Sequence, residues 1–357
     1  MGVCESVQRS NNNNNKKIII EKEKNEKNNC KNSNNSFEST KNSSILSKKT
    51  DENFKNYILP SNLAIHDDIN KYYSINNNEI IGEGGSGTIF LGENNKGKFA
   101  IKRILKKNCK YKEDLIREVS FSKILNHKNI LKYYSVFEDK DYISIVMELG
   151  EKGDLFEFIV NSPILHIPLK LCVDLTEQIL SALDYLHNKV KIIHRDLKPE
   201  NFIIKIDKNN NIICKLIDFG LSCEIEKEKK YFDFLGTLNY CAPEIILRKG
   251  YNEKIDIWAL GIIIFNLITG CEVFKIENDE DLMDEIKYKK INFDNIENKE
   301  MKNLLILMLN RNDNERINSK DALEIIKNIK KNIKYSEKDD EEYKLFIDFF
   351  KKRNGIF

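Results

Sequence analysis

At residues 192–204 the chain reads IIHRDLKPENFII. Two apolar stretches flank a polar run in which an acid, a cation and an amide, Asp196, Lys198 and Asn201, lie within six positions. Phosphoryl transfer requires such a set, because a carboxylate must orient and deprotonate a hydroxyl, a cation must balance the moving charge, and Mg²⁺ needs oxygen ligands. The stretch therefore favours a phosphoryl-transfer site over an ordinary polar loop.

Motifs on both sides of this stretch extend the pattern. KLIDFG places Asp218 seventeen positions after Asn201, as a second hard oxygen donor suited to Mg²⁺. Upstream, IGEGGSGTI carries the G-x-G-x-x-G spacing at Gly82, Gly84 and Gly87. A strand is expected directly after these glycines, which fits a flap over a nucleotide triphosphate, whereas a dinucleotide-binding fold needs a helix there. On this motif alone, an ordinary glycine hairpin is equally open.

A lysine and a glutamate follow the glycine motif. FAIK places Lys102 at the end of an apolar strand, where it needs an anionic partner, and Glu118 in the helical stretch LIREVSF is a candidate. Taken alone, FAIK favours the alternative that Lys102 is a solvent-facing lysine on an edge strand. The complete series of glycine loop, Lys, Glu, H-R-D-x-K-x-x-N, D-F-G and A-P-E, ending at Glu244, excludes chance assembly.

With these motifs in this order, the chain resembles the eukaryotic protein kinases over roughly residues 73 to 330. The resemblance implies an α+β, bilobal fold, with a β-rich N-lobe containing one main helix and a mostly α-helical C-lobe. It also implies ATP and Mg²⁺ as cofactors, Asp196 as the catalytic base, Lys198 on the γ-phosphate, and Asn201 and Asp218 on the metals. Lys102 would hold the α/β-phosphates while pairing with Glu118. The nucleotide-binding residues that it implies are Ile81, Gly82, Glu83, Gly84, Gly85, Ser86, Gly87, Ile89, Ala100, Lys102, Glu148, Gly150 and Asp154.

The target hydroxyls are expected to be those of Ser and Thr in proteins. Lys198 and the pair Gly236-Thr237 are typical of Ser/Thr kinases, with Thr237 placed against Asp196 and Lys198. VMEL-x-x-x-GDLF and YNEKIDIWALGIII are most similar to the calcium/calmodulin-dependent and calcium-dependent kinases, and the Asn/Lys-rich composition is apicomplexan-like. GCEVF at Gly270 departs from the family's usual G-x-P-P-F.

The stretch KYFDFLGTLNYCAPE, residues 230–244, then reads as the second half of an activation segment. Many kinases of this type place a phosphorylated threonine where this chain has Asp233, and that phosphate pairs with the residue equivalent to Arg195. A carboxylate has less charge than a phosphate, so Asp233 would mimic the switch in part. Asp154 and Glu200 stand where related kinases attract arginines upstream of the target hydroxyl, which predicts a modest basic preference.

Composition sets the organisation and the compartment. The 357 residues have a net charge of +2 and no large basic block, which argues against nucleic acid as a partner. The eight cysteines form no C-x-x-C pair and fit a reducing, cytoplasmic compartment. We expect a monomer with a disordered extension at 1–74, a kinase domain at 75–330, divided into an N-lobe at 75–150 and a C-lobe at 151–330, and a helical tail at 331–357.

The first residues, MGVCES, fit the pattern for myristoylation of Gly2, with Cys4 available for palmitoylation. A chance match is the alternative, because the pattern is short. One myristoyl chain binds membranes with only ~10⁴ M⁻¹, so stable anchoring needs a second signal. The sequence therefore predicts a location on the cytosolic face of a membrane.

The alternative to an active kinase is a pseudokinase that acts as a membrane-tethered scaffold. Loss of Lys102, Asp196 or Asp218 would favour that scaffold, yet all three are present.

Calcium-dependent kinases carry EF-hands behind the catalytic domain, and this sequence ends soon after Lys330, so we expect no calcium site and no calcium dependence. The stretch DKNNNIICKLID at 207–218 mimics a calcium loop but lacks glycine at its sixth position, which predicts a strand–turn–strand instead.

In the tail, apolar residues including Phe346 and Phe350 share one helical face. That face predicts a helix packed on the C-lobe, with an autoinhibitory or calmodulin-binding segment as the alternative.

Overall fold

The computed structural model describes Leu59 and residues 62–84, 87–108, 112–150, 153–164, 166–207, 209, 211–276 and 278–352. All of them belong to the unit Thr50–Phe357. The predictions for Gly2, Cys4, Gly85 and Ser86 lie outside the described residues.

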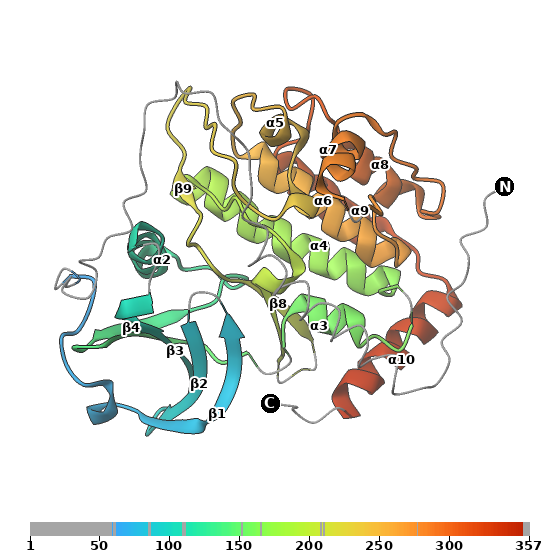
Figure 1. The fold of residues 1–357 in the computed structure, drawn as a ribbon. Helices are drawn as coiled ribbons and strands as arrows, with labels where there is room; N and C mark the ends of the chain where they lie inside the picture. Colours follow the sequence, from blue (N-terminus) through green and yellow to red (C-terminus); the bar gives the residue numbers. More distant parts are fainter. Residues whose placement is uncertain are drawn as a thin grey trace. The chain divides into compact units, whose positions relative to one another are not determined.

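The N-terminal lobe is an antiparallel sheet of five strands in the order β1-β2-β3-β5-β4, with helix α2 beside it (Figure 1). Its strands are rich in β-branched and aromatic residues, which favour a pleated sheet. β5, with the sequence YISIVM, lies between β3 and β4 and is almost wholly buried. The elements are β1 (Ser74–Gly84), β2 (Gly87–Asn94), β3 (Gly97–Leu105), η3 (Lys106–Asn108), α2 (Lys112–Ile124), β4 (Tyr133–Glu138) and β5 (Tyr142–Met147).

The C-terminal lobe is mostly helical. Its central helix α6 is apolar on every side and is therefore buried all round, with Trp258 fully inaccessible. The helices are α3 (Leu155–Val160), α4 (Leu169–Asp184), η4 (Tyr185–Val190), η5 (Pro199–Asn201), η6 (Leu238–Tyr240), α5 (Pro243–Ile246), α6 (Lys254–Thr269), α7 (Asp279–Tyr288), α8 (Lys299–Met308), α9 (Ser319–Asn332) and α10 (Glu337–Lys352).

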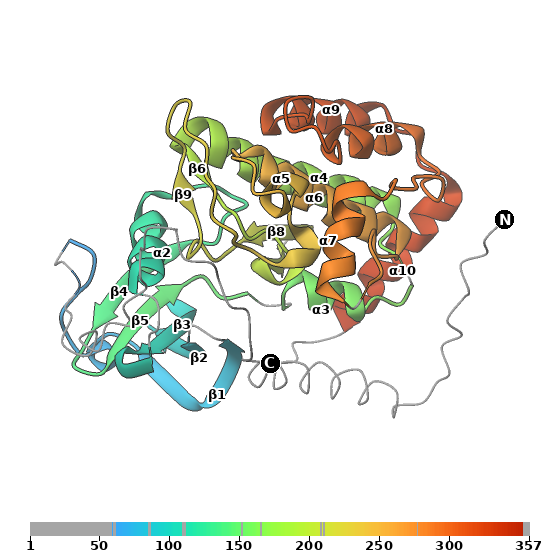
Figure 2. The ribbon, with the colours of Figure 1, turned by 45° about the horizontal axis from the view of Figure 1, so that its top comes forward.

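Two short antiparallel strand pairs flank the loops that carry Asp196 and Asp218. β6 (Ile192–Ile193) pairs with β9 (Cys223–Glu224), and the two lie side by side in Figure 2. β7 (Phe202–Ile206) pairs with β8 (Ile212–Leu216). The Asp207 carboxylate accepts hydrogen bonds at 2.8 Å from the backbone N–H groups of Asn209 and Asn211, which closes the turn. The strand–turn–strand prediction for this stretch, and the bilobal α+β fold as a whole, are confirmed.

Asparagine, which is abundant in this chain, has a structural use in the C-lobe. The side chain of Asn298 accepts from Met301 N, and that of Asn318 accepts from Asp321 N, each at 2.9 Å. Each residue precedes a helix and satisfies an N–H group that has no partner inside the helix. Local sequence therefore sets where α8 and α9 begin.

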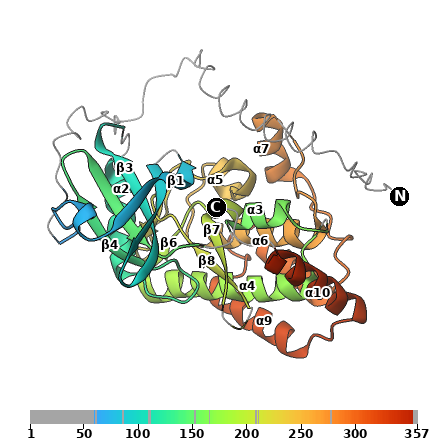
Figure 3. The ribbon, with the colours of Figure 1, turned by 90° about the horizontal axis from the view of Figure 1, so that it is seen from below.

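The tail forms helix α10, which packs beside α3 and α4 (Figure 3). Phe346 and Phe350 are buried against Phe158 of α3, with ring centroids 5.1 and 4.2 Å apart. Outside the apolar contact, Lys170 pairs with Asp340 at 3.0 Å. The apolar face thus joins the C-lobe core.

The expectation of disorder throughout residues 1–74 is wrong for residues 62–74. Ile65 forms a parallel bridge with Phe137 of β4, and η2 (Ile69–Lys71) follows it. Tyr73 packs edge-on against Phe99, with ring centroids 5.3 Å apart. Polar composition averaged over a long stretch conceals the few apolar residues that find an edge of the sheet to cover.

Candidate active site

Asp256, at the start of α6, binds the backbone of the loop that carries Asp196. The buried Asp256 carboxylate accepts from the backbone N–H groups of His194 at 2.8 Å and Arg195 at 2.9 Å, and from His187 Nε2 at 2.8 Å. Burial alone would raise the pKa of Asp256, but these donors outweigh it and lower the pKa. Asp256 is therefore an ionised anchor that fixes the loop's backbone.

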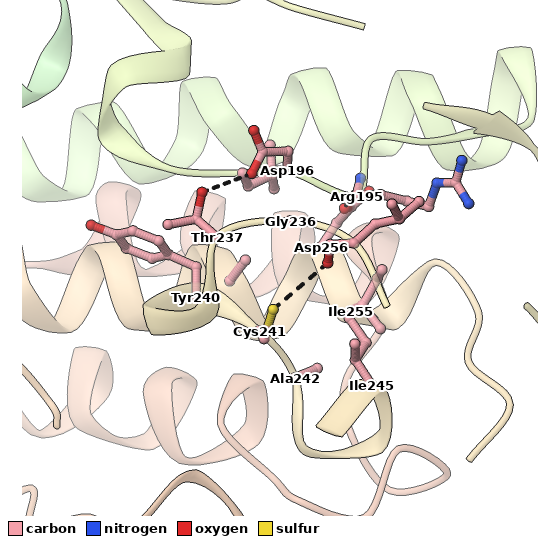
Figure 4. Close-up of a pocket in the computed structure, with 13 residues that line it drawn as sticks. Arg195, Asp196, Gly236, Thr237, Tyr240, Cys241, Ala242, Ile245, Ile255 and Asp256 are labelled. Atoms are coloured by element: carbon pink, nitrogen blue, oxygen red, sulfur yellow. Dashed lines mark hydrogen bonds between the residues drawn. The ribbon is translucent and has the colours of Figure 1, made fainter. Parts of the chain in front are cut away.

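Asp196 contacts both Thr237 and Lys198, and Figure 4 shows its hydrogen bond with Thr237. Thr237 Oγ1 donates to Asp196 Oδ1 at 3.0 Å, and Lys198 Nζ lies 2.9 Å from Asp196 Oδ2 and donates to Thr237 Oγ1 at 3.2 Å. Gly236, with φ of +95°, permits this approach, since a Cβ there would lie 2.7 Å from Arg195 O. The structure thus brings together the predicted base, cation and threonine.

Lys102 and Glu118 form a second buried pair, between β3 and α2. Lys102 Nζ lies 2.9 Å from both carboxylate oxygens of Glu118, and both side chains are buried. Burial raises the pKa of Glu118, and the Lys102 ammonium opposes that shift. The predicted partner of Lys102 is the one that the fold supplies.

Asn201 and Asp218 are adjacent because Ile217 N donates to Asn201 O at 2.9 Å. The Asn201 amide nitrogen donates to Asp196 O at 2.7 Å and to Asp196 Oδ2 at 3.2 Å, so its oxygen remains the group that can act as a ligand. Asp218 adds a carboxylate, of which Oδ1 accepts from Gly220 N at 3.1 Å. One amide oxygen and one carboxylate fit Mg²⁺, which takes few protein ligands and completes its shell with water and phosphate.

The walls of the expected nucleotide site are apolar. Gly82 pairs with Ile89 across β1 and β2, and Gly87 has φ of +149°, where a Cβ would lie 2.6 Å from Arg103 O. Ala100 forms a buried cluster with Leu131 and Met147. Residues that pack on this cluster include the predicted Ile81 and Ile89, together with Tyr133, Leu149 and Ile217, which sequence reasoning missed. Ile217 directly precedes Asp218, so its position next to a known motif could have indicated it.

Glu148 is placed differently from the other predicted nucleotide residues. Its carboxylate lies 2.8 Å from Lys205 Nζ and 3.0 Å from Lys215 Nζ, on β7 and β8. Burial would raise the pKa of Glu148, yet the two ammonium groups lower it. Any contact of Glu148 with adenine therefore falls to its backbone. Nearby Gly150 leaves room for β7, because a Cβ there would lie 2.3 Å from Ile203 Cγ2.

Asp154 caps helix α3 at the same end of the site. Its carboxylate accepts from Glu157 N at 2.8 Å, and burial raises its pKa to about 6, with Glu157 and Glu200 adding to the shift. Glu200 lies exposed in η5, within the stretch that also carries Asn201. Of the two predicted substrate acids, Glu200 thus acts electrostatically on Asp154.

The activation segment meets the catalytic loop through Arg195. Arg195 Nη1 lies 3.3 Å from Asp233 Oδ2 and 3.4 Å from Tyr251 Oη, while its Nε donates to Leu221 O at 2.6 Å. The Arg195 side chain is buried, whereas that of Asp233 is 64% exposed. The predicted Arg195–Asp233 ion pair is present, and solvent around the exposed Asp233 carboxylate weakens it.

Replacing Asp233 with alanine is expected to lower the activity of phosphatase-treated protein by up to about fivefold, because an exposed ion pair is worth about 0.2–1 kcal/mol. Peptide phosphorylation by wild type and variant after phosphatase treatment measures this. Glu228→Ala, in the same segment with a side chain 85% exposed, is the control. Wild type that is inactive after dephosphorylation would contradict partial mimicry by Asp233.

Comparisons with known proteins agree with this geometry. The chain matches the family described as "Protein kinase domain" over residues 75–326. It is 37% identical over 258 residues to calcium-dependent protein kinase 4 of Plasmodium berghei, covering 69% of this chain and 48% of that protein. It is 33% identical over 270 residues to calcium-dependent protein kinase 21 of Arabidopsis thaliana, covering 72% and 49%. The chain spans about half the length of these curated relatives. It belongs to the protein kinase family and is related to the calcium-dependent group.

Proposed function

We propose that this chain transfers the γ-phosphate of ATP to serine and threonine hydroxyls of proteins. The observation that carries the proposal is the contact of the Thr237 hydroxyl with Asp196 at 3.0 Å and with Lys198 at 3.2 Å. A hydroxyl beside a carboxylate and an ammonium is the arrangement that phosphoryl transfer to an alcohol needs. The formed Lys102–Glu118 pair supports an active arrangement rather than a scaffold.

The roles follow from the positions of the groups. Asp196 would accept the proton of the substrate hydroxyl, and Lys198 would stabilise charge on the transferring phosphoryl group. Lys102, held by Glu118, would orient the α- and β-phosphates. Asn201 and Asp218 would hold Mg²⁺, which, when bound, neutralises charge on the phosphates.

The full chain tests this with ATP labelled at the γ-phosphate, Mg²⁺, and peptides that differ only in a central Ser, Thr or Tyr. We expect label on the Ser and Thr peptides and none on Tyr. Absence of transfer, or preference for Tyr, would refute the proposal.

A calcium chelator at saturating Mg²⁺ should leave the rate unchanged, because Asp207, the first residue of the calcium-like stretch, caps its own hairpin turn.

If Asp154 binds an arginine of the substrate, the preference for peptides with an arginine upstream of the target hydroxyl should depend on pH. Because the pKa of Asp154 is raised to about 6, the carboxyl is mostly neutral below that pH and charged above it. The ratio of kcat/KM for a peptide with an upstream arginine to that for its norleucine counterpart should therefore rise as pH increases through about 6. Asp154→Asn should give a flat ratio. A ratio that rises equally in the variant would assign the preference to another group.

We propose that the protein is held on the cytosolic face of a membrane by acyl groups on Gly2 and Cys4. The proposal is supported by the sequence MGVCES. Among the described residues, no helix has both the length and the apolar character to cross a membrane. Gly2→Ala is expected to move the protein from the membrane pellet to the supernatant after fractionation, whereas the control Val3→Ala should stay in the pellet. A pelleted Gly2→Ala protein would place the anchor elsewhere.

A further inference from the structure

A segment upstream of the family match, Leu59 together with residues 62–73, lies along β4 and the back of α2. We call it the N-segment; Figure 1 shows its course, in blue, leading into β1. Ile65 N donates to Val136 O at 2.8 Å, and Glu138 N donates to Ile65 O at 2.9 Å. β4 is the last strand of the sheet, so the N-segment covers an edge that would otherwise expose backbone groups.

The apolar side chains of the N-segment reach α2. Leu59 and Ala64, only 1% and 6% exposed, share a buried cluster with Leu115 and Val119 of α2. Lys123 Nζ, near the end of α2, donates to the backbone oxygen of Asn62. The cluster is completed from the sheet by Ile104, Val136, Ile143 and Ile145. The N-segment thus fills the space between the helix and the sheet.

A buried carboxylate fixes the N-segment in place. Glu138, 4% exposed at the end of β4, accepts from Leu59 N at 2.7 Å and lies 3.2 Å from His66 Nδ1. Its other oxygen lies 2.6 Å from the buried Lys106 Nζ. A buried charge is stable only with such partners, and two of them come from the N-segment. Polar contacts with Glu138 therefore fix the position of the N-segment, in addition to its apolar contacts.

Helix α2 connects this contact to the reacting groups. Leu115 and Val119 are four residues apart and share one helical face, while Glu118, next to Val119, contacts Lys102. Arg117 Nη1 of the same helix donates to Gly220 O at 2.7 Å, two residues after Asp218. A rotation or shift of α2 would therefore disturb Glu118 together with the segment that follows Asp218.

We propose that the N-segment positions the catalytic groups: Leu59 and Ala64 hold the back of α2 so that Glu118 stays paired with Lys102. The inference rests on the proposed function, because the pair matters only if Lys102 orients ATP. These are positioning residues, since they share a cluster with residues of α2 and of the sheet and act on the site through α2, which carries Glu118. Catalytic competence thus depends on residues outside 75–326.

The test uses the full chain with Ala64→Asp, which places a charge in the cluster behind α2. At a temperature where circular dichroism shows both proteins folded, we expect kcat/KM to fall on the order of tenfold, as for mutations that alter coupling between sites. The milder Leu59→Ala should lower it less. Ile65→Asp places the same charge on a side chain that is 43% exposed, so its activity should stay within about twofold of wild type.

A double-mutant cycle with Glu118→Gln separates positioning from general stability. If the N-segment acts through the ion pair, Ala64→Asp should cost little further activity once Glu118 is replaced. Effects that multiply independently would overturn the proposal. Normal kcat/KM in both Ala64→Asp and Leu59→Ala would overturn it as well.

Hydrogen exchange gives a readout that needs no activity. Ala64→Asp should accelerate amide exchange in Lys112–Ile124 relative to α4, whereas Ile65→Asp should not. Unchanged exchange in α2 would refute the positioning role even in an active enzyme. Conversely, if wild type transfers no phosphate, faster exchange in α2 alone would retain the structural coupling while the proposed function fails.

Discussion

Replacing Asp196 with asparagine is expected to lower kcat by about 10²–10⁴-fold, the range typical for loss of a general base. The substitution keeps the size of the side chain but removes its charge and basicity. Lys198, now 2.9 Å from Asp196 Oδ2, would lose its anionic partner. The KM for ATP should change little, because Lys102 and Glu118 are untouched.

Steady-state phosphorylation of a Ser peptide, together with the binding affinity for an ATP analogue, measures these effects separately. Asp294→Asn is the control, because that carboxylate is 84% exposed and far in sequence from every catalytic motif. We expect wild-type rates for it. An Asp196→Asn protein that retains more than about a tenth of wild-type kcat would show that Asp196 is not the base.

Replacing Arg316 with alanine is expected to cost about 3–5 kcal/mol of unfolding free energy, because it leaves a buried charge without its partner. Arg316 donates from Nη1 and Nη2 to the two oxygens of Glu244, at 2.6 and 2.9 Å, and both residues are buried. Its guanidinium carbon also lies 5.2 Å from the ring centre of Trp258. The pair joins the end of the activation segment to the chain before α9.

Denaturant unfolding followed by Trp258 fluorescence measures this cost. Lys302→Ala, which removes a solvent-exposed pair with Asp294 at 3.5 Å, should change stability by less than about 1 kcal/mol. The double variant Glu244→Gln, Arg316→Met should be more stable than Arg316→Ala, because it buries no lone charge. An Arg316→Ala protein within about 1 kcal/mol of wild type would contradict the assignment.

The sequence by itself determined the family and the chemical groups of the site. Asp196, Lys198 and Asn201 lie in one short loop, so their proximity follows from covalent spacing. Lys102 lies within the apolar strand β3 and Asp218 follows β8, and the protein kinase fold is the one in which the motifs occur in this order. Boundaries drawn from composition were less reliable, since residues 62–74 are packed on the N-lobe.

Only the tertiary structure decided which groups act together across distance. The Glu148 carboxylate turns to Lys205 and Lys215, and Asp154 acquires a raised pKa from burial. The N-segment is fixed to the end of β4 by the hydrogen bond from Leu59 N to the Glu138 carboxylate, which joins residues 79 positions apart. Local pattern cannot encode such pairings, because burial and partner choice depend on how distant segments pack, and that packing exists only in the folded chain.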